Sequence, residues 1–410
     1  PEIIKDIHKK YLKAGSDIIE TNSFGALDIV LKDYDLEDRA FEMNKKAAEL
    51  VNETILEYRS ENPSDTRNLY VAGALGPSNK SISVTGGVTF DELVHTYYTA
   101  ISGLLAGGVD LILFETIQDT RNLKAAYLGL KKATEENYTV PLMLSFTIES
   151  TGTTLAGQTA DAFYYAVNHM HPFSVGLNCA TGPEFMTQFL KTLNDISNTY
   201  ISVYPNAGLP NEDGEYEETP VTLANKLEPF FKNKYLNIVG GCCGTTPDYI
   251  RKIKAKTVNY EPRNIDKNKN FNNLSGLISL EIPKNRPIYV GERTNVIGSR
   301  IFKNLIAQEK FDEATEVARL QIKGDADVID VCLANPDRDE VADMKAFLEK
   351  VSKFAKVPIM LDSTDINVVE KGLTYLQGKG IINSINLEDG EEKFKKMAEV
   401  IKEFGAAVVV

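Results

Sequence analysis

The stretch AISGLLAGGVDLILFET, residues 100–116, decides the fold. Its first part can form a helix that stops at Gly108, and glycine is the residue that most often follows the end of a helix. Its second part, residues 110–114, is an apolar run without alternating polar side chains, and it ends at the polar pair Glu115 and Thr116. A strand that is apolar on both faces indicates a parallel sheet covered on both sides. The stretch therefore predicts one helix–strand repeat of an α/β fold.

The same helix–glycine–strand unit recurs along the chain. Residues 3–14 have apolar side chains at helical spacing, stop at Gly15 and lead into a short strand, and residues 317–330 repeat the pattern. Candidate strands in the first part of the chain are residues 17–20, 69–74, 110–114, 142–147, 174–177, 201–204 and 236–239. These seven candidate strands are one fewer than the eight strands of a (β/α)8 barrel. We expect the missing first strand to precede Pro1, so that the chain is an internal fragment of a longer protein.

A change of composition separates a second domain. Residues 258–273 contain six asparagines together with Pro262 and several lysines, which is typical of a linker. The strand–helix alternation then restarts, with candidate strands at residues 288–291, 327–331, 359–362, 382–386 and 406–410. The predicted fold is α/β, with two (β/α)8 TIM-type barrels in tandem, the first lacking its first strand and the second truncated after about five strands. The predicted domains are residues 1–257 and 285–410, with a linker at 258–284.

Composition excludes several classes of function. The 58 acidic residues exceed the 45 basic ones and give a net charge of −13, so the chain offers no favourable field to the phosphates of nucleic acid. No apolar run reaches the roughly 18 residues of a membrane span, and no signal peptide opens the chain. Four cysteines are too few for a disulfide framework in a chain of 410 residues. We expect a cytoplasmic protein, in which clustered cysteines bind metal or do chemistry.

Three of the four cysteines follow predicted strands. Cys179 comes two residues after the end of one strand, and Cys242 and Cys243 lie in the segment GGCCGTTP, residues 240–247, between a strand and a helix. The flanking glycines let the backbone bend so that both thiolates face one point. Three thiolates with one open position describe a catalytic zinc site, whose electron-rich metal suits alkylation of a bound thiol. Adjacent cysteines can also be inert core residues or a vicinal disulfide, and Cys332 is interpreted as a core or loop thiol.

These segments resemble the homocysteine S-methyltransferase family, whose members are zinc-dependent barrels. The resemblance covers about residues 1–257 and is carried by GLNC at 176–179, GGCCGTTP at 240–247, ETNSFG at 20–25 and FET at 114–116. It implies Cys179, Cys242 and Cys243 as zinc ligands and Glu115 as the partner of the homocysteine amino group, although a structural ion pair remains an alternative for Glu115. The family's Asp-Gly motif on the first strand is absent. The predicted substrate contacts of this domain are Thr21, Asn22, Glu115 and Asn206.

Asn206 has two interpretations. It follows a predicted strand in the segment YPNAG, residues 204–208. Its side chain can approach the open position of the zinc ion, or it can only hold its own turn. The sequence leaves both open.

Polar residues also follow the strands of the second domain. The segment GERTN, residues 291–295, follows its first strand, and Asp330, Asp362 and Asn386 end the next three. Carboxylate and amide groups can pair with the donors and acceptors of a pterin ring, although each could instead cap a turn. This set resembles the pterin-binding family, in its methyltransferase branch more than in its synthase branch. Asn295 is the candidate catalytic contact to the methyl-bearing nitrogen N5.

The two resemblances together imply the architecture of cobalamin-dependent methionine synthases. The expected reaction is methyl transfer from 5-methyltetrahydrofolate to homocysteine through cobalamin, which gives methionine and tetrahydrofolate. The expected partners are homocysteine, 5-methyltetrahydrofolate and a cobalamin-binding domain outside this chain. One alternative is a cobalamin-independent homocysteine S-methyltransferase, but the pterin-type second domain argues against this alternative. The other is a non-catalytic zinc- or folate-binding fragment, or a thiol redox sensor built on Cys242 and Cys243.

Overall fold

The computed structural model describes residues 1–134, 140–208, 216, 218–267, 269 and 272–410. The chain divides into two compact units, of which the first comprises residues 1–155 with 172–269 and the second comprises residues 156–171 with 270–410. The domain boundaries predicted from the sequence, residues 1–257 and 285–410, remain predictions. Among the described residues, no helix combines the length and the apolar character that a membrane span requires.

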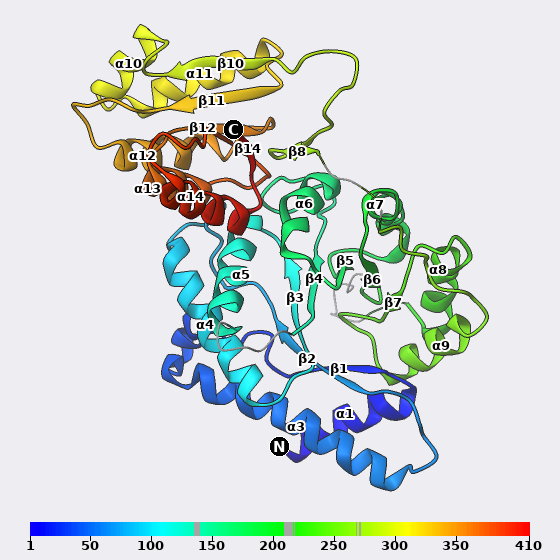
Figure 1. Ribbon diagram of the computed structural model, residues 1–410. Helices are drawn as coiled ribbons and strands as arrows, with labels where there is room; N and C mark the ends of the chain where they lie inside the picture. The colour runs from blue at the N-terminus through cyan, green and yellow to red at the C-terminus, as the bar shows by residue number, and fades with distance from the viewer. Residues whose placement is uncertain (135–139, 209–215, 217, 268, 270–271) are drawn as a thin grey trace. The chain divides into compact units, whose positions relative to one another are not determined.

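The first unit is built on a parallel sheet of seven strands, which follow one another in sequence order from β1 to β7 (Figure 1). All seven predicted strands are present, and the α/β class is confirmed. Closure of the sheet into a (β/α)8 barrel stays a prediction. The strands are β1 (Ile18–Glu20), β2 (Tyr70–Leu75), β3 (Leu111–Ile117), β4 (Leu142–Phe146), β5 (Ser174–Asn178), β6 (Tyr200–Tyr204) and β7 (Ile238–Val239).

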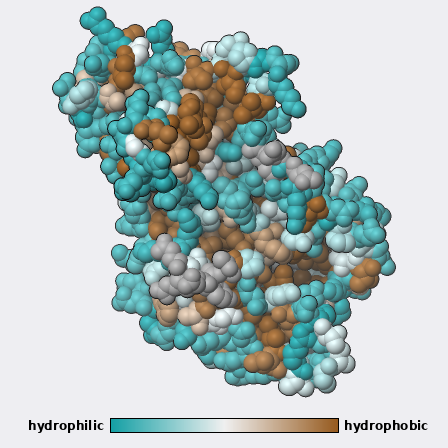
Figure 2. Space-filling model, viewed as in Figure 1, coloured by the Kyte–Doolittle hydropathy of each residue, from teal (hydrophilic) through white to brown (hydrophobic). Residues whose placement is uncertain are grey.

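Helices connect these strands. Those of the first unit are α1 (Glu2–Ala14), α2 (Asp28–Leu31), α3 (Ala40–Glu61), α4 (Phe90–Ala106), α5 (Thr120–Thr134), α7 (Pro183–Ile196), α8 (Pro220–Lys232) and α9 (Pro247–Thr257), with 3-10 turns at Lys32–Tyr34 and Glu37–Arg39. Local sequence sets their ends: Thr89 and Glu92 form a capping box at the start of α4, and Gly15 ends α1 in the left-handed conformation. On the face in Figure 2, hydrophilic residues cover much of the surface.

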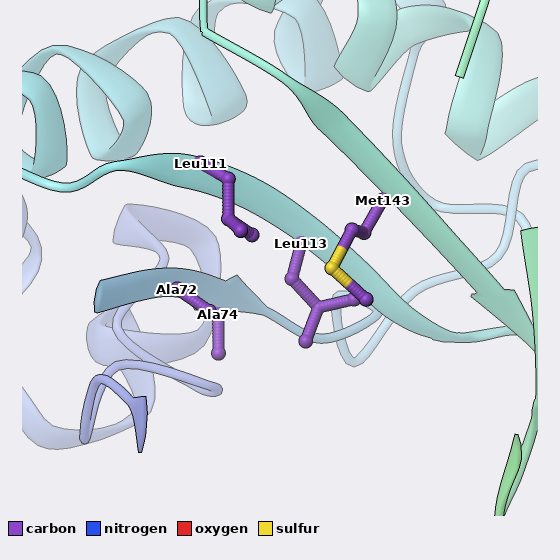
Figure 3. Packing of buried hydrophobic residues seen from close by; sticks show 5 residues of the cluster. All are labelled: Ala72, Ala74, Leu111, Leu113 and Met143. Carbon is purple, nitrogen blue, oxygen red and sulfur yellow. The ribbon is translucent and has the colours of Figure 1, made fainter. Parts of the chain in front are cut away.

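A buried apolar cluster shows that the first sheet curls. Alternate residues of β2, β3 and β4 share one face and form the cluster of Ala72, Ala74, Leu111, Leu113 and Met143 (Figure 3). Ile18 of β1 and Ile238 of β7 pack against this same cluster, although the two strands lie at opposite ends of the strand order. The sheet therefore wraps around its own apolar face, and the helices cover the other face.

Close approach of α3 and α4 depends on a glycine. A Cβ atom at Gly103 would lie 2.4 Å from the backbone oxygen of Phe41, a distance at which one of the two helices would have to shift. Gly103 is thus the reason that the two helices can pack with their backbones nearly in contact. This packing supports the outer layer beside β2 and β3.

The second unit contains a parallel sheet of five strands in the order β10 to β14. These strands are β10 (Val290–Asn295), β11 (Val328–Cys332), β12 (Ile359–Asp362), β13 (Ile381–Asn383) and β14 (Ala407–Val409). The helices of this unit are α6 (Ala160–Val167), α10 (Arg300–Ala307), α11 (Phe311–Lys323), α12 (Glu340–Val351), α13 (Ile366–Leu373) and α14 (Glu391–Phe404), with a 3-10 turn at Asn168–Met170. The alternation of parallel strands and helices agrees with the predicted α/β class, and completion as a second barrel stays a prediction.

The fourth strand of this sheet ends earlier than the sequence pattern indicated. We predicted a strand at residues 382–386, whereas β13 ends at Asn383. The chain turns after this point, and the side-chain oxygen of Asn386 accepts a hydrogen bond of 3.0 Å from the backbone N–H of Glu388. Asparagine side chains that bond to the backbone two residues later compete with strand pairing. Asn383, and not Asn386, is therefore the polar residue at the end of this strand.

Part of the predicted linker has regular structure. Strands β8 (Leu274–Ser275) and β9 (Ser279–Leu280) form a small antiparallel hairpin within the second unit. The Ser275 hydroxyl donates a hydrogen bond of 3.1 Å to the backbone oxygen of Ala162 in α6. The hairpin thus holds α6 to the second unit.

Candidate functional site

The three predicted metal ligands come together at the carboxyl ends of β5 and β7. The sulfur atoms of Cys179, Cys242 and Cys243 all lie within 4.8 Å of one another, and Cys243 is 3.9 Å from each of the other two. Three sulfurs bound about 2.3 Å from one tetrahedral zinc ion would be about 3.8 Å apart. The cluster is therefore shaped to hold an ion of this kind. Cys332 belongs to the second unit and is not part of it.

Backbone bonds fix the loops that carry these cysteines. Cys179 and Ala180 have φ angles of 57° and 54°, in the left-handed region that non-glycine residues seldom adopt. The N–H of Cys179 donates to the oxygen of Tyr204 at 3.3 Å, and the N–H of Cys242 donates to the oxygen of Pro205 at 2.8 Å. Strained residues persist where their surroundings hold them, and they gather at functional sites. The end of β6 thus anchors the cysteine loops on both sides.

The proximity of the three thiols shifts their pKa values in different directions. A hydrogen bond from Cys242 is the main cause that lowers the pKa of Cys179 to about 5, and the Asn206 side chain acts in the same direction. The same bond to Cys179 raises the pKa of Cys242 far above its usual range, and burial raises the pKa of Cys243. The oxygen of Asn206 also accepts a hydrogen bond of 3.2 Å from the N–H of Cys243. A bound cation would favour the thiolate form of each cysteine.

Glu115 lies on β3 and is only 6% exposed. Burial, then the carboxylate of Glu20, then the Cys179 thiolate raise the pKa of Glu115 to about 9. Among the described residues, Glu115 has no basic side chain within ion-pair distance, so the structural ion pair considered from the sequence has no partner there. The ionised form of such a buried carboxyl group would be stabilised by a positively charged group of a bound ligand.

The two residues predicted after β1 differ in their surroundings. Thr21 is 4% exposed, and its hydroxyl lies 2.5 Å from that of Ser23 and accepts a 3.0 Å hydrogen bond from the N–H of Ala74. Thr21 thus ties the end of β1 to β2. Asn22 is exposed. No described contact joins either residue to the cysteine cluster.

The second unit brings three predicted residues together. The amide nitrogen of Asn295 donates to Asp330 at 3.1 Å and to Asp362 at 3.3 Å. The amide oxygen of Asn295 accepts from the N–H groups of Ile297 and Gly298 at 2.9 and 3.0 Å, which fixes the orientation of the amide. Residues of the neighbouring parallel strands β10, β11 and β12 therefore converge, as the order of the strands requires.

Both carboxyl groups of this cluster have raised pKa values. Burial raises the pKa of Asp330 to about 6, and its Oδ1 atom is buried without a hydrogen-bond partner among the described residues. Burial also raises the pKa of Asp362, while a hydrogen bond from the thiol of Cys332 acts in the lowering direction. A buried and unpartnered carboxylate oxygen can accept a hydrogen bond from a ligand.

Three residues that contact these clusters were not among the predicted site residues, and one predicted residue, Asn386, has no described contact with either cluster. Asn383 acts on the pKa of Asp330 in the lowering direction, and Cys332 acts on the pKa of Asp362 in the same direction. Asn178 is fully buried and contacts Cys242. Asn386 is exposed and bonds to its own turn. A correct placement of the end of β13 would have identified Asn383 as the last residue of this strand.

Comparisons with known proteins agree with this division of sites. The family described as homocysteine S-methyltransferase matches residues 1–257, and the family described as pterin binding enzyme matches residues 291–410. Among solved structures, the oxidized and metallated forms of the homocysteine methyltransferase MmuM from Escherichia coli are each 24% identical to this chain, with a TM-score of 0.53. Each match covers 62% of this chain and 84% of the other, and it supports the fold of the first unit.

The raised pKa of Asp330 predicts a pH-dependent effect of Asp330→Asn on stability. The proton on this buried group stabilises the folded state in full below about pH 3.8, and this contribution is lost as the pH rises through about 6. Asparagine stays neutral, so the free energy of unfolding of the variant should rise relative to the unsubstituted protein, by up to about 3 kcal/mol, between about pH 4 and pH 7. Urea denaturation over this range measures the difference.

The control is Asp337→Asn, at an exposed position. The free energy of unfolding of Asp337→Asn should differ from that of the unsubstituted protein by the same amount throughout this pH range. A constant difference for Asp330→Asn as well would contradict the assignment of a raised pKa to this group.

Proposed function

Because this chain belongs to the homocysteine S-methyltransferase family, we propose that it transfers a methyl group from 5-methyltetrahydrofolate to homocysteine through cobalamin, giving methionine and tetrahydrofolate. The observation that carries the proposal is the presence in one chain of a three-cysteine cluster and a separate pterin-type cluster of Asn295, Asp330 and Asp362. A thiol acceptor and a pterin donor each have a chemically suited site. The methyl group has to travel between them, which is the task of cobalamin on a module outside this chain.

In this proposal, Cys179, Cys242 and Cys243 would hold one zinc ion, which would also bind the homocysteine sulfur. Such an ion would lower the pKa of the substrate thiol, and the three thiolates would keep the bound sulfur electron-rich and nucleophilic. Asn206 contacts both Cys179 and Cys243, so it can hold the loop and also face the open position. These contacts favour the first of the two interpretations of Asn206 over a role in its own turn alone.

The amino end of homocysteine is assigned to Glu115. The substrate ammonium would supply the positive charge that this buried carboxyl group lacks, and pairing with it would lower the raised pKa of Glu115. Asn22 and Thr21 remain proposed contacts at the end of β1, with Thr21 acting through the position of its loop.

In the second unit, Asp330 and Asp362 are proposed to accept hydrogen bonds from the pterin ring. The unpartnered Oδ1 of Asp330 supports this role. Asn295 is proposed to act on N5, because methyl loss from that nitrogen needs protonation or strong hydrogen bonding there. Asn386 stays a predicted contact, but Asn383 is better placed for it.

A cobalamin-independent methyltransferase remains the second candidate, since the cysteine cluster alone would serve either enzyme. The convergence of Asn295 with two buried carboxyl groups favours the folate-dependent reaction, because a betaine or sulfonium donor gives such a cluster no role. Metal content separates both enzymes from a thiol redox sensor. A sensor needs no zinc, whereas the proposed enzyme needs about one per chain.

Cys242→Ala should abolish stoichiometric zinc binding. Two thiolates and a water molecule bind zinc far more weakly than three thiolates do. Elemental analysis of the purified variant checks this outcome. Cys332→Ala is the matched control, because Cys332 lies in the other unit, and it should keep about one zinc per chain. Full zinc in Cys242→Ala would show that the ligand assignment is wrong.

Asp362→Ala should weaken the binding of 5-methyltetrahydrofolate. The variant would leave a pterin N–H without its partner, at a cost of about 1–3 kcal/mol. This corresponds to roughly a 5- to 150-fold loss of affinity, measurable by calorimetry. Asp337→Ala, at an exposed position, should bind as the unsubstituted protein does. Equal affinity in Asp362→Ala would remove the folate assignment and leave the zinc site unaffected.

A further inference from the structure

We propose that Asn178 is a positioning residue that links the segment carrying Glu115 to the cysteine loop and so selects aminothiols of one chain length. The inference rests on the proposed function, in which Glu115 receives the substrate ammonium and the cysteine-bound metal receives the substrate sulfur. Asn178 ends β5, directly before Cys179, and its side chain is fully buried. It contacts neither end of the substrate in this scheme, and its role is to fix their separation.

The side chain of Asn178 bonds to three other segments. Its amide nitrogen donates to the hydroxyl of Thr116 at 2.8 Å and lies 4.0 Å from the sulfur of Cys242. Its amide oxygen accepts from the N–H of Thr116 at 3.0 Å and from the hydroxyl of Ser145 at 2.6 Å. One buried amide therefore connects β3, β4 and the loop after β7. Every donor and acceptor of this amide is used within the first unit.

The pairing with Thr116 is reciprocal, because Asn178 both donates to this residue and accepts from it. Thr116 has a φ of 56°, in the left-handed region that β-branched residues avoid. The pairing of β3 with β4 shifts register between Phe114 and Ile117, which places Glu115 and Thr116 in an irregular part of the strand. Such bulges redirect side chains beside active sites. The hydrogen bonds of the Asn178 amide hold the bulge at Glu115 and Thr116 in place.

Glu115 comes directly before Thr116, so a shift of this bulge moves the carboxyl group relative to the cysteine cluster. A substrate bound at both ends must match that separation. Homocysteine and cysteine carry the same thiol and the same ammonium group but differ by one methylene between them. If the separation is rigid, the site binds homocysteine without strain and cysteine only with strain. If the separation is loose, the site binds both aminothiols and discriminates less between them.

The test measures the affinities of homocysteine, cysteine and 2-mercaptoethanol for the zinc-loaded full chain by calorimetry. Asn178→Ala should weaken homocysteine binding by about 10- to 100-fold, because the bulge loses its buried hydrogen bonds. Cysteine binding should weaken by no more than about threefold, so that the ratio of the two affinities falls by at least about threefold. The binding of 2-mercaptoethanol, which has no ammonium group, should be unchanged. A merely structural defect would not alter this ratio.

Two further variants keep the test decisive if Asn178→Ala does not fold. Thr116→Val removes the hydroxyl that accepts from Asn178 and should lower the homocysteine-to-cysteine ratio in the same direction. Thr116→Ser restores a hydroxyl and should restore the ratio. Asn44→Ala is the control for loss of a buried asparagine, because Asn44 is fully buried and donates to the backbone of Ala26 and Ala40. It should leave the ratio unchanged.

Each other outcome overturns a defined part of the scheme. An unchanged ratio in both Asn178→Ala and Thr116→Val overturns the role of Asn178 alone, and so does an equal loss of all three thiols. A wild-type protein that binds zinc but shows no preference of any kind for homocysteine over 2-mercaptoethanol overturns the proposed function. That result would be visible before any variant is made.

Discussion

The site of the first unit depends on the parallel pairing of β5, β6 and β7. Asn178 pairs with Tyr204 and Val203 pairs with Val239, so the three strands end at one edge of the sheet. Cysteines 64 positions apart in the chain thereby bring their sulfurs to 3.9 Å. A slip of one residue in this register would turn inward side chains outward and separate the thiols. The approach of the three thiols is thus a consequence of strand register.

The second unit uses the same geometric rule with different atoms. Three neighbouring parallel strands deliver Asn295, Asp330 and Asp362 to one point, where nitrogen and oxygen donors and acceptors replace sulfur. Soft thiolates suit zinc and a sulfur substrate, whereas carboxyl and amide groups suit the hydrogen-bonding edge of a pterin. Burial raises the pKa of Asp330 to about 6, as it raises that of Glu115 to about 9. Each site therefore holds a buried carboxyl group that a ligand can satisfy.

The sequence was sufficient to predict the features that repeat along the chain. Apolar strands without alternation predicted the parallel sheets, and the glycine-framed cysteines at strand ends predicted the sulfur cluster. It was insufficient where side chains compete with the backbone. The turn at Asn386 shortens β13, so Asn383 takes the strand-end position. The left-handed Thr116 and its bonds to Asn178 join segments 62 residues apart, which no local pattern encodes.

X-ray absorption at the zinc edge tests the central claim most directly. The zinc-loaded protein should show three sulfur neighbours and one lighter atom at about the distances of a zinc–thiolate site. Addition of homocysteine should replace the lighter atom with a fourth sulfur. A spectrum that keeps the same three-sulfur environment with saturating homocysteine, or one with fewer than three sulfurs in the free protein, would contradict the account.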